Sequence, residues 1–480
     1  MKKFIKLTCL LLALAMTLPM IFACKKEDEN TDDASNGSVS TEDGIAGIPK
    51  QNYGTDFTII YPNAGLFVDY YWAEEIGSSS ISKANYEREM AIEEHLGIEI
   101  YYESFEQNQG VLNSMLEHNH LAGLDEYQLS MTHCFQDLVT VMSAGYLTDL
   151  TEVSGISMNE EYWNVNIMNS IKFQGHTYLG SSSFILHTPT VVLFNKDMAN
   201  ALQGVSADKM YEHVREKTWT IEQMRIYASM ADISENASLT DPLKGTYGYV
   251  SDTNWELCGF VTASGYYHVT TDNDGKYQLR DFNNSIYDIF KEVVAMTDSN
   301  YYFGWDWAAK ENEKISMSSG QAFFGTVGTD DMIKAMINTN VHLGVLPYPT
   351  IEKDMDYLSL DWAGYFCIPS VVSDKKLSGE VVELFSYLGK TKVETEYYDV
   401  LLGLRASDEP QDSEMLELIF DNLTIEPALT FLNAGESALS SIFYTIPYMI
   451  LNNQKAMASW YASNYRGAAN MLNQVNAVTE

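Results

Sequence analysis

The chain has 480 residues, which at about 100–200 residues per domain favours two to four domains. Hydrophobic residues make up 46% and charged residues 20%, ordinary values for a globular protein with a sizeable core, and they exclude a mainly disordered chain. The 66 acidic residues outnumber the 29 basic ones, for a formal net charge of −37. This excess of negative charge argues against nucleic-acid binding and against electrostatic docking to anionic lipid.

Residues 1–23 have the pattern of a secretory signal peptide. Three lysines precede an apolar run from Leu7 to Phe22, too short and wrongly flanked for a membrane-spanning helix. The run ends in Ile-Phe-Ala-Cys24, which resembles the lipobox of bacterial lipoproteins. The resemblance implies cleavage before Cys24 and a diacylglyceryl group on its sulfur, and two acyl chains give stable anchoring. The alternative is an ordinary signal peptide with an incidental cysteine.

Residues 24–52 are acidic at first and then rich in Ser, Gly and Thr, with few apolar side chains. Such a segment cannot offset the entropy lost on ordering, so the sequence predicts a disordered tether between the lipid anchor and a folded part that begins near Tyr53. No later stretch reaches the length of about 18 apolar residues that a membrane span needs.

The remaining cysteines are Cys134, Cys258 and Cys367, an odd number at wide spacing. This pattern contains neither a disulfide framework nor a paired metal motif. We therefore expect no metal and no cofactor, and a fold that depends on its apolar core.

The first folded region alternates between strand and helix patterns. This alternation predicts βαβ units and a parallel sheet, whose ligands would bind outside the carboxyl ends of the strands. Asn63 follows the first expected strand, and His133 and Gln136 follow the third. The expected elements are strands at 57–61, 98–102 and 127–131 and helices at 82–96, 110–120 and 135–144.

A second αβ region begins with an apolar strand at 191–194. Thr220 and Gln223 fit a capping box at a helix start. Asp274-Gly275 between two short β-prone runs predicts a hairpin, and a calcium loop is the alternative. The chain ends in a predicted helix from about Lys455, whose apolar stripe indicates core packing.

The segment Val-Val-Leu-Phe-Asn-Lys-Asp at 191–197 resembles a signature of extracellular solute-binding proteins of the carbohydrate-uptake type, the maltose-binding-protein-like receptors of ABC transporters. Further fragments resemble other motifs of the family, in the family's order. They lie at 145–150, 173–178, 218–220, 245–248, 319–324, 343–347 and 364–369. The resemblance covers about residues 53–400, and the last eighty residues match poorly.

The resemblance implies an α/β, two-lobed periplasmic-binding-protein-like fold with a hinge and a ligand cleft between the lobes. The first lobe is expected at 53–190 and 348–405, and the second at 191–347 and 406–480. The protein would be a monomer that delivers its solute to ABC permease subunits. It would be lipid-anchored on the outer face of the cell membrane, or periplasmic in a host with an outer membrane.

No motif for catalysis emerges from the sequence. His118 and His120, two residues apart on a helix, do not share a face, and adjacent His133 and Cys134 would point apart. The sequence marks no local pair of carboxylates of the kind a glycosidase uses. We expect a binding protein, not an enzyme; the alternatives are a surface enzyme acting on glycans and a sensor or adhesion lipoprotein that reuses the fold.

Sugar recognition requires aromatic faces against C–H surfaces and polar groups against hydroxyls. Trp219 resembles a structural tryptophan of the family, and core packing is the alternative for every other tryptophan. The negative charge of the chain favours a neutral sugar or oligosaccharide, with cationic solutes and peptides as alternatives. The candidate ligand-binding residues are Asn63, His133 and Gln136 in the first lobe, Trp255, Trp305 and Trp307 in the second, and Asp361 and Trp362 in the crossover.

Overall fold

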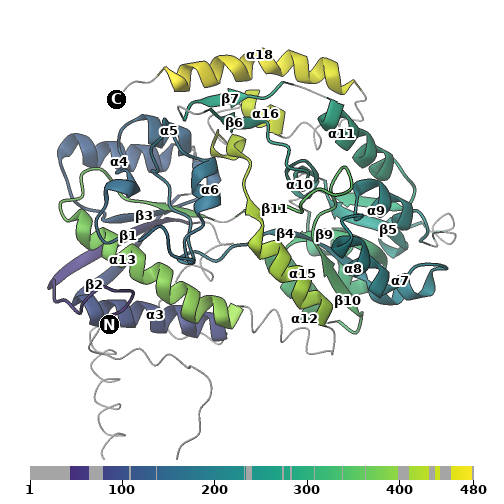
Figure 1. The fold of residues 1–480 in the computed structure, drawn as a ribbon, viewed down its shortest axis with the longest axis horizontal. Coiled ribbons are helices and arrows are strands. Elements are labelled where there is room, and N and C mark those ends of the chain that lie inside the picture. Colours follow the sequence, from purple (N-terminus) through teal and green to yellow (C-terminus); the bar gives the residue numbers. More distant parts are fainter. Residues whose placement is uncertain are drawn as a thin grey trace, which may run out of the picture. The chain divides into compact units, whose positions relative to one another are not determined.

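The computed structural model describes residues 44–63, 79–106, 110–136, 138–231, 233, 240–253, 255–272, 275–281, 284–306, 309–337, 339–362, 364–397, 410–431, 438–443 and 456–477 (Figure 1). The predicted signal peptide, Cys24 and Trp307 lie outside these residues. Among the helices within them, none combines the length and the hydropathy that crossing a bilayer requires.

The folded part begins earlier than Tyr53, because the end of the expected tether is packed. Ile48 is buried, and its carbonyl lies 2.8 Å from Nε2 of His95. The amide of Gln51 donates to the carbonyl of His95 at 2.8 Å. Residues 44–52 therefore pack against the end of the helix at Ser80–Leu96, and Ile45, Ala46 and Ile48 supply the apolar contacts.

The first sheet has the strand order β12-β3-β1-β2. As predicted, β1 (Thr55–Pro62) runs parallel to both β2 (Ile98–Phe105) and β3 (Leu129–Thr132). The fourth strand, β12 (Tyr365–Cys367), joins antiparallel to β3 from far along the chain. The helices between these strands are α3 (Ser80–Leu96), which ends at the predicted residue, and α4 (Val111–Ala122). After β3 come η1 (Cys134–Gln136) and α5 (Leu138–Ser143).

The second sheet has the order β10-β4-β9-β5-β8. Its strands are β4 (Thr190–Asn195), β5 (Tyr247–Asp252), β8 (Tyr302–Trp305), β9 (Ala322–Gly328) and β10 (Leu343–Leu346). The helices that follow its strands are α7 (Lys196–Ala201), α8 (Ala207–Arg215), α9 (Ile221–Ala228), α10 (Trp255–Ala263), α11 (Asn284–Thr297) and α12 (Thr329–Ile337). Thr220 caps α9 by accepting from the amide of Gln223, which is the hydroxyl half of the predicted capping box.

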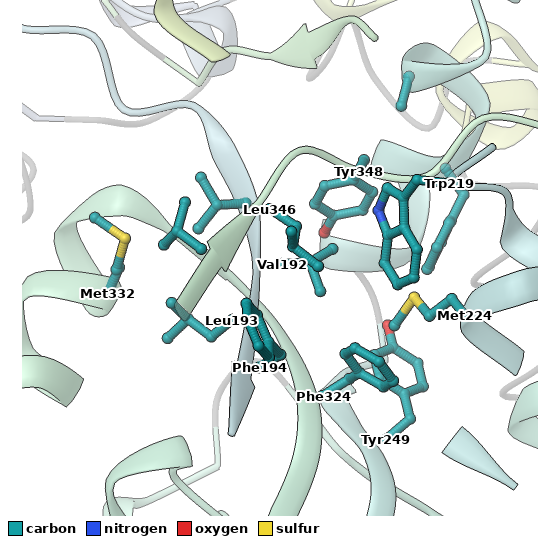
Figure 2. Close-up of a cluster of buried hydrophobic side chains, with 14 of the residues drawn as sticks. Val192, Leu193, Phe194, Trp219, Met224, Tyr249, Phe324, Met332, Leu346 and Tyr348 are labelled. Carbon is teal, nitrogen blue, oxygen red and sulfur yellow. The ribbon is translucent and has the colours of Figure 1, made fainter. Parts of the chain in front are cut away.

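The core of the second sheet explains two of the motifs. Trp219 is fully buried beside Phe324 and donates from Nε1 to the carbonyl of Pro347 at 3.0 Å, so its predicted structural role is confirmed (Figure 2). Val192, Leu193 and Phe194 of β4 are buried in the same cluster. The apolar half of the 191–197 signature is therefore a central strand of this sheet.

The polar residues of the signature, Asn195, Lys196 and Asp197, bond to elements around β4. Asn195 caps α7 by accepting from the amide of Met198 at 3.0 Å. Lys196 is buried, and its Nζ lies 2.9 Å from Oδ2 of buried Asp412. Asp412 is the third residue of α15 (Pro410–Asp421). Asp197 pairs with His342 at 2.9 Å. Each polar residue of the motif thus has a structural partner.

Three of the described segments that connect the surroundings of the two sheets lie together. Residues 187–189 lead into β4, β11 (Ser359–Leu360) precedes β12, and β13 (Leu423–Thr424) follows α15. β11 and β13 pair in parallel, and Pro189 forms a β-bridge with Asp361. The three crossing segments therefore lie side by side and are joined by backbone hydrogen bonds.

The C-terminal part contacts the surroundings of both sheets. α15 packs on the second sheet, but η8 (Pro427–Phe431) contacts η1 and α5 beside the first sheet. Phe431 and Leu439 share an apolar cluster with Ile60 of β1. The sequence assigned all of 406–480 to the second lobe, because the contacts made after β13 leave no mark in the local pattern.

The predicted hairpin and the predicted C-terminal helix are confirmed. β6 (Val269–Thr271) pairs antiparallel with β7 (Tyr277–Leu279), and α18 (Met457–Asn476) lies against β7 (Figure 1). The remaining elements are α6 (Val165–Ser170), α13 (Lys375–Leu388), α16 (Ala438–Phe443), a π-helical turn at Gly389–Val393, and 3-10 turns at Leu150–Glu152, Pro242–Lys244, Glu311–Glu313 and Met317–Ser319.

Candidate functional site

The predicted site residues lie where strands of the two sheets end. His133 directly follows β3, and Trp362 lies just before β12, whose first residue, Tyr365, pairs with Thr132 at that end of β3. In the second sheet Trp255 begins the helix after β5, and β5 ends opposite Trp305 of the parallel strand β8. The carboxyl ends of parallel strands are where open α/β sheets bind ligands.

His133 joins the end of β3 to the crossover. Its Nε2 donates to the carbonyl of Trp362 at 2.7 Å. Its Nδ1 lies 3.3 Å from the thiol of Cys134, so the expectation that these adjacent side chains point apart is wrong. Because a carbonyl only accepts, the hydrogen of the imidazole is on Nε2, and Nδ1 is left to accept from the thiol. Burial lowers the pKa of His133 to about 4, so the ring is neutral at pH 7. A neutral, buried imidazole positions the backbone of Trp362.

Gln136 stabilises the same turn through a hydrogen bond. Its side chain is fully buried, and its Oε1 accepts from the amide of His133 at 2.6 Å. Its Nε2 is buried without a hydrogen-bond partner in the structure. Gln136 therefore holds His133 in place, and an amide donor remains available if the surroundings rearrange.

Asp361 lies at the centre of the crossing segments. Its side chain is 3% exposed and accepts from Nδ1 of His187 at 2.6 Å and from the amide of Thr188 at 3.0 Å. Its own amide donates to the carbonyl of Thr424 at 3.0 Å. Burial opposes charge on His187, but the charge and the hydrogen bond of Asp361 raise the pKa of His187 overall. Asp361 thus connects all three crossings.

Three aromatic rings from distant parts of the chain meet beside this network. Trp255 and Trp362 pack edge to face, with ring centroids 5.0 Å apart and an interplanar angle of 89°. Phe443 of α16 adds a second edge-to-face contact with Trp362 at 6.3 Å. Both tryptophans are only partly buried. The structure therefore brings together five predicted residues: His133, Gln136, Trp255, Asp361 and Trp362.

The other predicted residues are placed differently. Asn63 is exposed at the end of β1, where its amide donates to the carbonyl of Phe105 at 2.7 Å. The ring of Trp305 is partly buried and packs near Phe303, with centroids 6.3 Å apart. Trp307 lies outside the described residues. A ligand role for these three stays a prediction.

Sequence reasoning missed Glu256, the neighbour of Trp255. Glu256 accepts from the hydroxyl of Tyr348 at 2.9 Å. Burial, with the nearby charge of Asp252, raises the pKa of Glu256 well above its ordinary value. Its position directly after Trp255, at the carboxyl end of β5, was the available signal. His187 and Phe443 were also missed, and nothing local marks them.

Two of the cavities formed by the described residues lie elsewhere in the structure. One of about 480 Å³ runs along α4 past Met115 and Asn119, and one of about 180 Å³ lies between β6, Ser170 and Pro427. Neither is lined by a predicted site residue. Across the described residues, no group of three or more His, Cys, Asp and Glu side chains is arranged to hold a metal ion. The candidate site therefore rests on the convergence of side chains around Trp362.

Comparison with known proteins gives matches among solved structures alone: no family model and no curated protein matches the chain. An ABC substrate-binding protein from Listeria monocytogenes, solved with cycloalternan, is 12% identical with a TM-score of 0.54, and the match covers 87% of this chain and 99% of that protein. The fold is that of ABC solute-binding proteins.

Two further matches agree on that fold. An ABC solute-binding protein from Agrobacterium radiobacter K84, solved with ribitol, is 14% identical with a TM-score of 0.51, and the match covers 88% of this chain and 99% of that protein. One from Thermotoga lettingae TMO, bound to α-D-tagatose, is 14% identical with a TM-score of 0.50, covering 88% of this chain and 100% of that protein. The predicted α/β binding-protein fold is confirmed.

Proposed function

We propose that this protein is the solute-binding component of an ABC importer and that it captures a neutral sugar, oligosaccharide or polyol. The observation that carries the proposal is the pairing of Trp255, at the carboxyl end of one sheet, with Trp362, at the crossover into the other. In a fold shared with proteins solved with cycloalternan, ribitol and tagatose, such rings offer flat apolar faces to a sugar.

The chemistry of the site favours a neutral solute. His133 is held neutral by burial, and the surroundings of Glu256 raise its pKa and so disfavour its charged form. Asp361 already accepts two hydrogen bonds in the crossings. We therefore assign recognition to the tryptophans and Glu256, and we assign Asp361 to positioning of Trp362.

The same chemistry disfavours an enzyme. Burial raises the pKa of the Cys134 thiol far above its ordinary value, and a thiol nucleophile must ionise to react. Its histidine neighbour donates to a backbone carbonyl through Nε2. We propose a cycle of capture, lobe closure and delivery, with the lobes at 53–190 and 348–405 and at 191–347 and 406–426, and with the segment after 426 returning to the first.

A thermal-shift screen over sugars, polyols, amines and peptides tests the function. We expect one sugar or polyol to raise the melting temperature, because a ligand present at about 100 times its Kd adds about 2.7 kcal/mol to the stability of the folded state. Small-angle scattering with that ligand should give a smaller radius of gyration. Stabilisation by amines or peptides alone would contradict the sugar assignment. If the ligand binds but deletion of neighbouring permease genes leaves its uptake unchanged, a sensor is favoured.

The proposed location depends on Cys24. We propose that lipid on Cys24 anchors the protein to the outer face of the cell membrane, or on the periplasmic side in a host with an outer membrane. Cys24→Ala should then move the protein from the membrane fraction to the soluble fraction, because two acyl chains would be lost. Cys9→Ala, within the same leader, is the control. Membrane association that survives Cys24→Ala, with no lipid on the mature protein, would refute the anchor.

A further inference from the structure

The cavity beside α4 has the size of a small-molecule site. Its volume is about 480 Å³, and such sites typically measure about 300–1,000 Å³. Val111, Ser114, Met115 and His118 line it from α4, at the three- and four-residue spacings that place side chains on one face of a helix. Tyr127, which lies just before β3, also lines it. The cavity therefore follows one face of α4.

Asn119 also lines this cavity, from a position where an apolar side chain would be expected. Leu112 and Leu116 precede it at helical spacing and belong to an apolar cluster that packs on the first sheet. Asn119 is 2% exposed, and neither its Oδ1 nor its Nδ2 has a hydrogen-bond partner among the described residues. Burying an amide without partners costs stability, because the amide loses its hydrogen bonds to water. Folding alone would favour leucine here.

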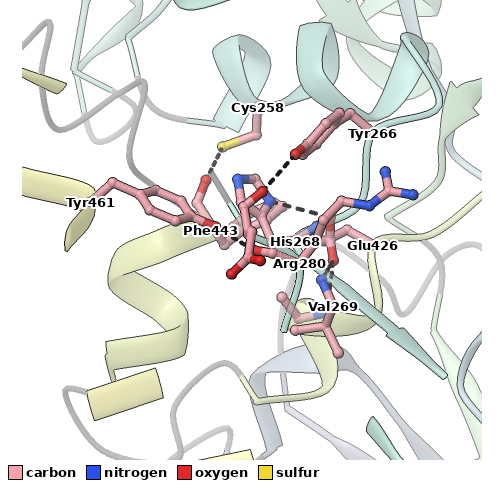
Figure 3. Close-up of polar contacts among 10 residues, drawn as sticks. Cys258, Tyr266, His268, Val269, Arg280, Glu426, Phe443 and Tyr461 are labelled. Carbon is pink, nitrogen blue, oxygen red and sulfur yellow. Dashed lines mark hydrogen bonds and ion pairs between the residues drawn. The ribbon is translucent and has the colours of Figure 1, made fainter. Parts of the chain in front are cut away.

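Glu426 and Asp361 show how this fold compensates buried polar groups. Glu426 is fully buried and accepts from the amides of His268 at 2.7 Å and Val269 at 3.0 Å (Figure 3). Asp361 accepts from His187 and from the backbone in the same way. The side chain of Asn119 has no such compensation within the described part of the chain, and it borders a cavity. A molecule in that cavity can supply the missing partner.

Two further polar groups of the lining have no hydrogen-bond partner among the described residues. They are the hydroxyl of half-buried Tyr127 and the imidazole of exposed His118. Burial, followed by the charges of Glu103 and Glu126, raises the pKa of Tyr127, so its hydroxyl keeps its proton and can donate. With the amide of Asn119, three polar groups that each donate and accept hydrogen bonds line one cavity.

The lining favours a neutral ligand with hydroxyl groups. It contains no Asp, Glu, Lys or Arg among the described residues, and the charges of Glu103 and Glu126 nearby disfavour an anion. Sugar hydroxyls donate and accept hydrogen bonds, as the three polar side chains do. Val111, Met115 and the ring of Tyr127 are partly buried apolar groups that can cover the C–H face of a sugar ring.

We propose that the cavity beside α4 is a second ligand site, which binds a neutral sugar through Asn119, Tyr127 and His118. None of these residues belongs to the candidate site around Trp362. The second site therefore does not rest on the proposed function: either site can bind its ligand while the other fails to do so.

The methyl group of Met115 reports on this cavity directly. In protein with 13C-labelled methionine methyl groups, Met115→Leu identifies its NMR signal. The probes are glucose, maltose and myo-inositol, with putrescine and adenosine for comparison. We expect at least one of the first three to shift the Met115 signal in a saturable way, and Trp362→Ala to leave that shift unchanged. No shift with these three, a shift with putrescine or adenosine alone, or loss of the shift in Trp362→Ala would overturn the proposal.

Asn119→Leu separates binding from folding. We expect the Kd of the probe, measured by the same titration, to rise about tenfold through lost hydrogen bonds. The urea midpoint of unfolding should stay the same or rise, because an apolar side chain replaces an amide without partners. An unchanged Kd, or a lower urea midpoint, would show that the amide serves the fold and would overturn the site.

Asn113→Leu is the matched control for Asn119→Leu. Asn113 lies on the same helix, and its Oδ1 is also buried without a partner, but Asn113 does not line the cavity. The Kd of the probe should therefore be unchanged in this variant. An equal loss of affinity in both variants would contradict recognition by Asn119.

Tyr127→Phe provides a second variant if Asn119→Leu does not fold. It removes one half-buried hydroxyl that has no partner among the described residues, and it keeps the ring. The Kd of the probe should rise about threefold or more, as is typical for the loss of one neutral hydrogen bond. An unchanged Kd would again overturn the proposal.

Discussion

Replacing Asp412 with asparagine is expected to lower the free energy of unfolding by about 3–5 kcal/mol, the usual cost of removing one partner of a buried ion pair. The side chains of Lys196 and Asp412 are 7% and 4% exposed, and their charged atoms lie 2.9 Å apart. Asp412 also accepts from the hydroxyl of Tyr211 at 2.7 Å and from the amide of Val345 at 2.9 Å. Urea denaturation of wild type and variant measures the loss.

Glu414→Gln is the matched control for Asp412→Asn, because Glu414 lies on the same helix and forms an ion pair with Arg215. In that pair the side chains are 46% and 42% exposed, so the expected loss is about 0–1 kcal/mol. Similar losses for the two variants, or a loss below about 1 kcal/mol for Asp412→Asn, would contradict a structural role for the lysine of the signature.

Trp362→Ala is expected to weaken binding of the solute by tenfold or more. Loss of an aromatic face removes apolar contact area and about 1 kcal/mol beyond it, and each 1.4 kcal/mol is a factor of about ten in Kd. Calorimetric titration with the ligand found in the screen measures the effect. Trp362 also packs edge to face on Trp255 and Phe443, so its replacement should also lower the free energy of unfolding. Chemical denaturation of the same variant measures that part of the effect.

Trp219→Ala provides the control for Trp362→Ala. Trp219 is 0% exposed within the core of the second sheet, so its truncation should cost about 3–5 kcal/mol of folding free energy and leave the affinity of the folded fraction intact. If Trp362→Ala behaves in the same way, with a large loss of stability and unchanged affinity, the ring at 362 is packing and not recognition.

Local signals made much of the fold predictable from the sequence. Gly97 ends α3 in the left-handed conformation, and Thr220 caps α9, because both effects depend on neighbouring residues. The alternation of strands and helices predicted the parallel part of the first sheet. The partner of β3 at the edge of that sheet was not predictable in this way, since β12 comes from a distant part of the chain.

The candidate site shows the same limit. The end of a predicted strand indicated His133, its residue type indicated Trp255, and the predicted crossover indicated Trp362. The partners that define their roles are far away in sequence: His187 is 174 residues from Asp361, and the carbonyl that His133 binds is 229 residues away. Such contacts come from tertiary packing, so residue type and spacing could propose the members of the site but not their partners.

The position of β12 has a consequence for the order of folding. β3 pairs with β1 on one side and with β12 on the other, so the first sheet stays incomplete until the chain has been made as far as Cys367. Until then β3 presents an open edge, a template for pairing with other chains. The second sheet lies entirely between β3 and β12 in sequence and can form first. Folding should therefore nucleate in the middle of the chain, and β1 to β3 should form their complete sheet only after β12 has been made. Pairing of β12 with β3 joins residues far apart in sequence, so this last step should be slow.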